Sequence, residues 1–317
     1  MEQIIQLFEQ NYKKIEKFAG WTTGKPIVLL MASYYTARQQ EVNIDELQDA
    51  IAVIKKETGF FSTLRTNSLV QYVYAMQIAS EANKEGAIRE LLSNTEILRN
   101  AKFSNTSFTT IAALFLTSEN KEQQAERAQM MYREMRKKHI FLTSYEDVPI
   151  AVLFALDDAD IEQRADTMRR YYDELKASKF YQGNELQALS QILTMASIEY
   201  NKQIVPYIVA IRQQLEQAKI KMRPALYIQL GFLALAQIND EQLQQLIDLY
   251  ELFKNQKYLK WYKEQAFAIA VQQYLPTSTL GTNELLSVVS IELLLQMQYA
   301  ILATTTIVAV SSTSSNN

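Results

Sequence analysis

The sequence contains no cysteine and a single histidine, His139. The absence of cysteine excludes a disulfide framework, a thiol nucleophile and any cysteine-ligated zinc or iron–sulfur site. One imidazole excludes histidine-rich metal sites and leaves imidazole-based catalysis without support. The sequence therefore predicts a protein that carries no cofactor.

Glycine and proline are also scarce, with 7 and 5 residues in a chain of 317. Turn-rich all-β chains, collagen-like chains and disordered chains rich in these residues need far more of them, because they require positive φ or a fixed φ at many positions. The composition thus predicts an all-α fold.

The net charge is −3, and after Lys263 the only charged residues are Glu264, Glu284 and Glu292. A nearly neutral chain gives no electrostatic reason to expect nucleic acid as a partner. The amino terminus lacks the uninterrupted apolar stretch of a secretory signal. With no lipidation pattern either, these features predict a cytoplasmic location.

A period of about forty residues organises the chain. Amphipathic segments end with a large apolar residue, and five positions later stands a second apolar residue that is preceded by a basic one. Successive starts of these pairs lie 37, 40, 40 and 38 residues apart. The pairs are Leu98 and Phe103, Met135 and Ile140, Leu175 and Phe180, Leu215 and Ile220, and Phe253 and Tyr258.

A second, more apolar helix lies between consecutive amphipathic ones. A pair of helices leaves one apolar face uncovered, and stacking the next pair covers it. We therefore expect helical-hairpin repeats of about 40 residues, stacked as an α-solenoid or a compact helical array. Residues 1–22 would form a capping helix, residues 23–280 about six helix pairs, residues 281–310 an apolar helix packed on the array, and residues 311–317 a disordered polar tail.

Five basic residues, four lysines and His139, hold the same place in their repeats, just before the second apolar residue of each pair. In a stacked array such positions form a column, which could meet an acidic peptide or another extended anion. Each residue also complements the helix dipole at a C-terminus. These candidate binding residues are Lys102, His139, Lys179, Lys219 and Lys257.

Asp157, Asp158 and Asp160 form an acidic cluster that is comparable to the DDxxD magnesium motif of isoprenoid synthases. The second motif of those enzymes would begin at Asn239, but its hydroxyl and second carboxylate are missing, since Leu243 and Ile247 stand in their places. Both segments occupy the turn where a helix needs an N-cap. We therefore predict capping and neither a metal site nor a catalytic residue.

Residues 293–310 form a run of 18 uncharged residues, which is the lower edge of the length of a membrane span. Polar residues interrupt the run, and no lysine or arginine follows Lys263 to set an orientation. A buried terminal helix is the favoured interpretation, with a tail anchor as the alternative, so no membrane partner is expected.

The alternation of apolar helices with tyrosine-bearing ones, the lysine–aromatic helix ends and the apolar carboxyl end rich in small residues resemble a family of Gram-positive bacteria called domain of unknown function 4003. The resemblance covers most of the chain and supplies no catalytic residue. It implies an intracellular bacterial protein whose biochemical role is unassigned.

Together these features favour a non-enzymatic scaffold that binds a protein or peptide, because repeat arrays form extended surfaces without a catalytic constellation. One alternative is a metal-dependent all-α enzyme that acts on a phosphorylated lipid or nucleotide through Asp157, Asp158 and Asp160. The other is an adaptor tethered to a membrane by residues 293–310.

Removing the carboxyl end tests the anchor alternative. A chain that ends at Leu280 should aggregate or melt at a lower temperature, because an uncovered array end exposes apolar surface. Full-length protein should stay in the soluble fraction without detergent. Fractionation of both proteins checks this, and recovery of the full-length chain in the membrane pellet alone would contradict it.

Overall fold

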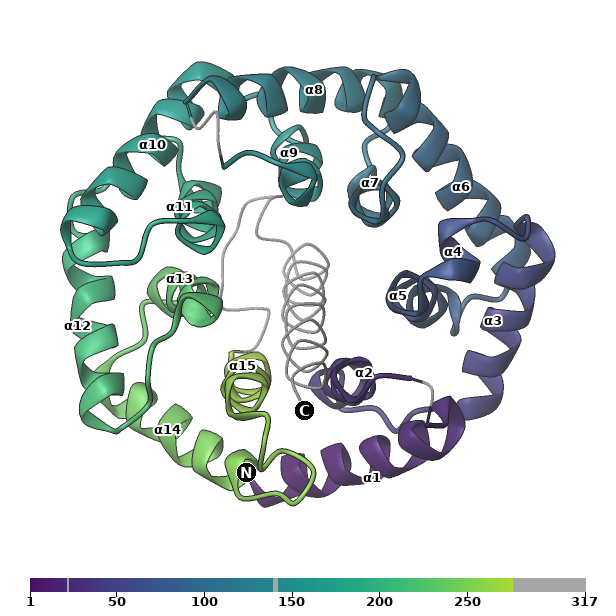
Figure 1. The fold of residues 1–317 in the computed structure, drawn as a ribbon, viewed down its shortest axis with the longest axis horizontal. Helices are drawn as coiled ribbons and strands as arrows, with labels where there is room; N and C mark the ends of the chain where they lie inside the picture. The colour runs from purple at the N-terminus through teal and green to yellow at the C-terminus, as the bar shows by residue number, and fades with distance from the viewer. Residues whose placement is uncertain (22, 139–141, 276–317) are drawn as a thin grey trace, which may run out of the picture. The chain divides into compact units, whose positions relative to one another are not determined.

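The computed structural model describes residues 1–21, 23–138 and 142–275, and within them the chain forms helices and turns but no strand. Fifteen α-helices, α1 to α15, follow one another in these described ranges (Figure 1). The all-α prediction is confirmed.

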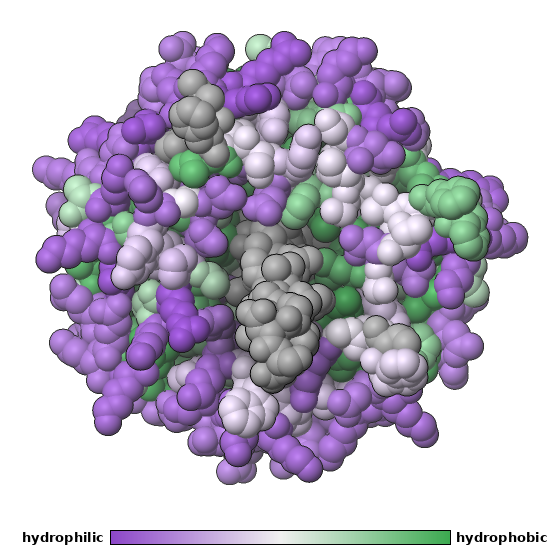
Figure 2. Space-filling view, in the orientation of Figure 1, coloured by the Kyte–Doolittle hydropathy of each residue, from purple (hydrophilic) through white to green (hydrophobic). Residues whose placement is uncertain are grey.

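Seven of the described helices are amphipathic. Their apolar residues recur every three or four positions and face the interior; in α1 these are Phe8, Tyr12 and Ile15. Hydrophilic side chains cover much of the face shown in Figure 2. The seven are α1 (Glu2–Ala19), α3 (Ile44–Glu57), α6 (Lys84–Asn100), α8 (Lys121–Lys138), α10 (Ile161–Ala177), α12 (Ile204–Gln217) and α14 (Asp240–Lys254).

More apolar helices alternate with these. In α13 every residue from Tyr227 to Ala234 is buried, as expected of a helix that is apolar on all sides. The apolar helices are α2 (Lys25–Ala37), α5 (Ser68–Ile78), α7 (Ser107–Ala112), α9 (Val148–Phe154), α11 (Asn184–Ala196), α13 (Tyr227–Leu235) and α15 (Lys263–Tyr274). The short helix α4 (Thr63–Thr66) precedes α5, and 3₁₀ turns lie at Ala113–Phe115, Tyr145–Asp147 and Pro224–Leu226.

The described residues form two compact units. Unit 1 holds Met1–Leu92 and Leu249–Tyr274, and unit 2 holds Ser93–Asp248 with Leu275. Unit 1 is therefore assembled from two segments that are distant in the sequence, whereas unit 2 is built almost entirely from one continuous segment.

Aromatic rings join the two segments of unit 1. The ring of Phe8 lies 5.2 Å from that of Phe253, in an edge-to-face arrangement. Tyr12 stacks on Tyr258, with 4.4 Å between ring centroids. Such pairs contribute about 0.5 to 1.5 kcal/mol each beyond the burial of their area. They hold α1 against the end of α14 and the turn that follows it.

A buried polar contact also joins α2 to α15. The hydroxyl of Ser33 donates to Oε1 of Gln272 at 2.5 Å, across 239 residues of sequence. Gln273 Nε2 donates to the backbone carbonyl of Ser33 at 3.0 Å. Ser33 is fully buried, so losing either partner would leave an unsatisfied polar group, which costs about 1 to 3 kcal/mol. These bonds fix the register of α15 on α2.

In unit 2 the apolar helices pack on the amphipathic ones, with α9 against α8 and α11 against α10. Figure 1 shows α9, α11 and α13 end-on and α8, α10 and α12 from the side. The predicted anchors that end the amphipathic helices are confirmed as core residues. Leu98, Met135, Leu175 and Leu215 are all 0% exposed.

The predicted helix 281–310, the predicted tail 311–317 and the candidate membrane segment 293–310 lie outside the described residues. Among the helices that are described, none combines the length and the apolar character needed to cross a bilayer.

Shortening an anchor should destabilise unit 2. Because Leu175 is fully buried, Leu175→Ala should lower the free energy of unfolding by about 2 to 5 kcal/mol, through lost burial and a residual cavity. Urea unfolding measures the change. The neighbouring Lys176 is exposed, so Lys176→Ala is the matched control and should change stability by less than about 0.5 kcal/mol. Equal effects of the two substitutions would contradict the assigned burial.

Candidate binding surface

Three of the predicted binding residues end their helices in the same backbone conformation. Lys102, Lys179 and Lys219 are left-handed, with φ of 74°, 65° and 62°. In each case the next residue's N–H donates to the carbonyl five positions earlier, which defines a Schellman motif. These bonds run from Phe103 to Leu98 (3.1 Å), from Phe180 to Leu175 (3.2 Å) and from Ile220 to Leu215 (2.9 Å).

The same motif explains the spacing of the apolar pairs in the sequence. A Schellman turn brings the residue after the left-handed position back against the last helical turn, so a hydrophobic contact accompanies it. Leu175 and Phe180 are 0% and 4% exposed. The two apolar residues are therefore buried at the helix end, and Lys179 between them remains exposed.

Lysine is an unusual occupant of this position. Glycine adopts positive φ without a steric penalty, whereas a residue with a Cβ loses about 1 kcal/mol there. The charge regains about 0.3 to 1 kcal/mol by complementing the helix dipole. The two terms nearly cancel, so stability alone gives lysine little advantage over glycine at Lys102, Lys179 and Lys219.

Side chains of the next amphipathic helix bind these helix ends. Arg212 of α12 donates to the carbonyl of Lys179 at 3.1 Å, and Gln129 of α8 reaches the carbonyl of Lys102 at 3.5 Å. Arg169 of α10 donates to the carbonyl of Lys138, at the end of α8, at 2.9 Å. In each of these three cases, a backbone carbonyl at the end of one amphipathic helix accepts a hydrogen bond from a side chain of the next one.

The other two candidates do not share this geometry. Lys257 lies in the turn after α14, belongs to unit 1 and has no positive φ. His139 lies outside the described residues. Of the five candidates, Lys102, Lys179 and Lys219 therefore share this backbone setting, which Gln39 and Gln237 also adopt at the ends of α2 and α13.

Sequence reasoning missed the exposed ring of Tyr181, two residues after Lys179. Tyr181 is 71% exposed, while its backbone N–H donates to the hydroxyl of Tyr227 at 3.1 Å. The preceding Phe180 packs edge-to-face on Tyr227, with 4.9 Å between centroids. Phe180 points inward, so the next residue, Tyr181, points outward. The position of Tyr181 directly after a predicted buried residue could have indicated its exposure.

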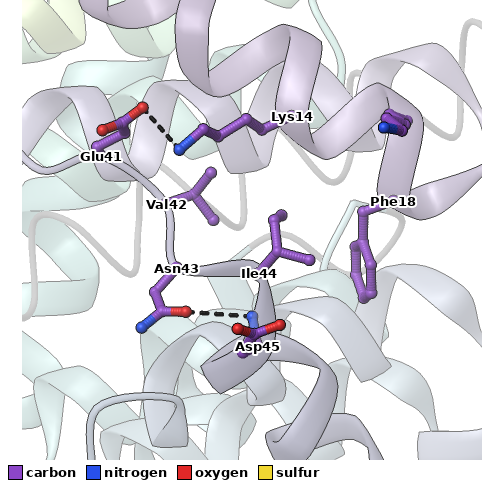
Figure 3. Close-up of a pocket in the computed structure, with 8 residues that line it drawn as sticks. Lys14, Phe18, Glu41, Val42, Asn43, Ile44 and Asp45 are labelled. Atoms are coloured by element: carbon purple, nitrogen blue, oxygen red, sulfur yellow. Dashed lines mark hydrogen bonds and ion pairs between the residues drawn. The ribbon is translucent and has the colours of Figure 1, made fainter.

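A surface hollow of about 710 Å³ lies in unit 1, between the end of α1 and the start of α3. Figure 3 shows Lys14 facing Glu41 across it, and the two form an ion pair of 2.7 Å. Asn43 caps α3 by accepting from the N–H groups of Asp45 (3.1 Å) and Glu46 (3.3 Å). Lys14, Glu41 and the side-chain oxygen of Asn43 therefore already have partners within the protein.

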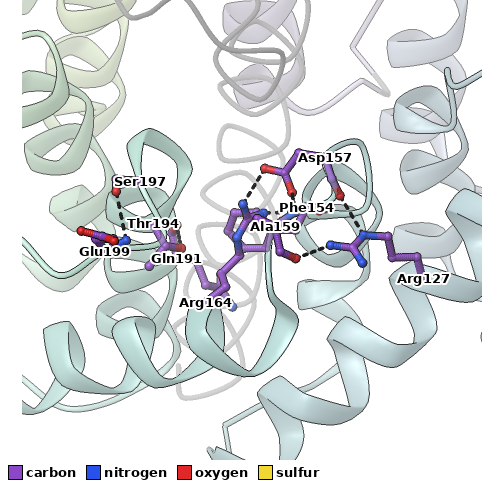
Figure 4. A network of polar contacts seen from close by, with 9 residues as sticks. All are labelled: Arg127, Phe154, Asp157, Ala159, Arg164, Gln191, Thr194, Ser197 and Glu199. Carbon is purple, nitrogen blue, oxygen red and sulfur yellow. Dashed lines mark hydrogen bonds and ion pairs between the residues drawn. The ribbon is translucent and has the colours of Figure 1, made fainter.

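The acidic turn after α9 is held by two arginines (Figure 4). Arg164, 3% exposed, pairs with the carboxylate of Asp157 at 2.5 Å, and its guanidinium lies 4.5 Å from the ring centroid of Phe154. Arg127 of α8 donates to the carbonyls of Asp157 (2.7 Å) and Ala159. The carboxylate of Asp157 therefore neutralises a buried cation.

The other two acids of the turn have separate roles. Asp160 is the N-cap of α10 and accepts from the N–H of Gln163 at 2.7 Å, while Asp158 is exposed to solvent. At the equivalent turn Asn239 accepts from the N–H of Gln242 at 2.9 Å. Within the described ranges no three acidic or histidine side chains are grouped as metal ligands would be.

Sequence reasoning also missed a buried carboxylate, Asp147, which is 8% exposed. Its Oδ1 accepts from the side-chain amides of Gln187 (3.0 Å) and Gln191 (2.5 Å), both on α11. Its Oδ2 accepts from the N–H of Ser144 at 2.7 Å in a capping box. Burial raises the pKa of the Asp147 carboxyl to about 6, although these hydrogen bonds act in the opposite direction. The capping box is visible in the sequence, but the contact with α11 is not.

Comparison with known proteins confirms the resemblance to a family of unknown function. The model of the family described as "Protein of unknown function (DUF4003)" matches residues 11–300. The chain is 26% identical to the uncharacterized protein YeaA of Bacillus subtilis (strain 168) over 272 residues, which are 83% of this chain and 81% of the relative. No solved structure matches the chain.

The buried carboxylate makes stability depend on pH. Because the pKa of Asp147 is raised in the folded state, the native protein binds a proton between about pH 6 and pH 4 that the unfolded chain does not. Protonation of the Asp147 carboxyl should therefore increase the free energy of unfolding by about 3 kcal/mol as pH falls through this interval. Asp147→Asn should remove that component.

Urea unfolding between pH 4 and pH 7 measures this difference. The matched control is Asp158→Asn, since Asp158 lies in the same unit and is exposed. Its pH profile should run parallel to that of the unaltered protein. A parallel profile for Asp147→Asn would show that the carboxyl at Asp147 is not desolvated.

Proposed function

The chain belongs to the DUF4003 family, and from the geometry of its helix ends we propose that it is a non-enzymatic helical-repeat scaffold in the cytoplasm. Its partner is an acidic segment of a protein or peptide. The binding residues are Lys102, Lys179 and Lys219, which we call the basic row. The observation that carries this proposal is the occupation of three left-handed helix ends by exposed lysines.

The repeat is part of the same proposal. Six pairs of an apolar and an amphipathic helix lie between α1 and α15 in the described ranges. Three of the amphipathic helices, α6, α10 and α12, end in the same motif. Hairpins of about 40 residues stacked as a solenoid or a compact array would produce this recurrence, because each hairpin buries its apolar face on the next.

Helix packing sets the spacing that a ligand must match. Lys179 and Lys219 end α10 and α12, which are in contact. Packed helices lie about 8 to 10 Å apart, and an extended peptide advances about 3.3 Å per residue. An extended peptide with an acidic side chain at every third residue would therefore present carboxylates to Lys179 and Lys219 at about this interval. Lys102 ends α6, and α8 comes between α6 and α10 in the chain, so Lys102 would meet a carboxylate further along the same peptide.

The metal-dependent enzyme is the weaker reading. Its candidate ligand Asp157 neutralises buried Arg164, and Asp160 caps α10. Recruiting these carboxylates to a metal would leave a buried guanidinium unpaired, at a cost of several kcal/mol. The tethered adaptor depends on residues 293–310, which lie outside the described residues.

Replacing the basic row by glycine separates binding from stability. Glycine fits a left-handed helix end without a Cβ clash, so Lys102→Gly, Lys179→Gly and Lys219→Gly together should leave the melting temperature nearly unchanged. Loss of three charges should weaken binding of peptides with glutamate at every third residue by about tenfold or more. A peptide array with glutamine at the same positions provides the uncharged probe.

The matched control replaces Lys176, Lys202 and Lys221 by glutamine. These lysines are exposed residues of unit 2 outside the basic row, and their loss changes the net charge equally. Acidic peptides should bind this variant nearly as well as the unaltered protein. If the glycine variant also retained binding, the lysines would serve only the helix dipole.

A further inference from the structure

Four large aromatic side chains of unit 1 are exposed in loops. Trp21 and Trp261 are 95% and 85% exposed, and Phe60 and Phe61 are 75% and 89% exposed. Each lies in a loop that follows an amphipathic helix and leads into an apolar one. We call these four residues the aromatic edge. Sequence reasoning did not single out these residues.

The contacts of α2 and α15 place two of these loops together. Lys25, at the start of α2, lies 5.6 Å from the ring centroid of Tyr262, which directly precedes α15. Further along both helices, Ser33 bonds Gln272. The helices therefore run in the same direction, with their first residues at one end. Trp21 and Trp261 precede those first residues, so both belong to that end.

Helix α5 runs in the same direction as α2. The hydroxyl of Thr23 lies 3.4 Å from that of Tyr72, and later in both segments Tyr34 donates to the carbonyl of Met76 at 3.2 Å. The loop that leads towards α5 therefore lies at the same end as those before α2 and α15. Its rings, Phe60 and Phe61, pack only edge-to-face on each other, 5.3 Å apart, and remain in solvent. Hydrophobic side chains protrude over the α3–α4 segment at the right of Figure 2.

The same three loops are basic. Segments 17–25, 55–65 and 257–263 contain eight lysines and arginines and one acidic residue, Glu57. Arg89 pairs with Glu57 at 2.7 Å, which neutralises that single carboxylate, and Glu85 pairs with Lys56 at 2.5 Å, which leaves seven of the eight basic residues for the surface charge. The chain as a whole has a net charge of −3, so positive charge is concentrated at the aromatic edge.

We propose that the aromatic edge docks unit 1 on a membrane surface that contains anionic lipids. Tryptophan and phenylalanine rings partition into the interface between headgroups and acyl chains. Lysines beside them gain free energy from anionic headgroups. The rings protrude from loops and are at least 75% exposed, which fits insertion into a bilayer surface. This inference is independent of the basic row, which lies in unit 2, and it departs from the expectation that no membrane is contacted.

The two tryptophans of the chain are both in the aromatic edge, so intrinsic fluorescence reports on it directly. Full-length protein is mixed with vesicles of phosphatidylcholine and phosphatidylglycerol, or of phosphatidylcholine alone. We expect the emission maximum to shift to shorter wavelength, and the protein to sediment, with the anionic vesicles. Partition should be about tenfold or more weaker with the neutral ones. No shift and no sedimentation with anionic vesicles would overturn the proposal.

Substitutions that keep both tryptophans locate the contact. Phe60→Ser with Phe61→Ser should weaken partition about tenfold or more. Tyr145→Ser with Tyr181→Ser, which alters exposed rings of unit 2, should leave it unchanged. Equal loss in both variants, or undiminished binding by the phenylalanine variant, would overturn the proposal; the second outcome would assign the contact to another segment.

Charge variants complete the test. Lys257→Gln, Lys260→Gln and Lys263→Gln together should weaken partition onto anionic vesicles about tenfold. Lys176→Gln, Lys202→Gln and Lys221→Gln together should not. A fluorescence change on adding a single-stranded oligonucleotide, without one on adding vesicles, would overturn the proposal in favour of base stacking.

Discussion

The Schellman motif that ends an amphipathic helix, with its pair of buried apolar residues, is the feature on which the arrangement of unit 2 depends. When Leu175 and Phe180 close on each other, the backbone between them must turn left-handed. That turn exposes Lys179 and leaves its carbonyl for Arg212 of the following amphipathic helix. One helix-ending motif therefore sets the direction of the chain, positions a charge and presents a carbonyl to the next amphipathic helix.

Local patterns were sufficient to predict what depends on neighbouring residues. Apolar residues five positions apart identified the helix ends, and scarce glycine and proline identified the all-α class. The N-cap role of Asp160 also follows from nearby sequence. Such features involve a few consecutive residues, so their energetics are visible without knowledge of the fold.

Contacts between distant segments could not be predicted in this way. The bond between Ser33 and Gln272, and the amides of α11 around Asp147, leave no trace in helical periodicity, because periodicity shows which face of a helix is apolar and not which helix covers it. The grouping of the four rings of the aromatic edge could not be predicted for the same reason. Trp21 and Trp261 are 240 positions apart, and only the parallel packing of α2 and α15 places their loops at the same end of unit 1.

Because unit 1 is assembled from two segments that are distant in the sequence, its parts are synthesised at different times. Ser33 leaves the ribosome 239 residues before its partner Gln272. At about 5 to 20 residues per second, α2 waits roughly 10 to 50 seconds for α15. The long segment of unit 2, Ser93–Asp248, is translated within that interval. The segment made first is thus completed only after most of unit 2 has been made, and the face of α2 that α15 covers stays unburied until α15 has been synthesised.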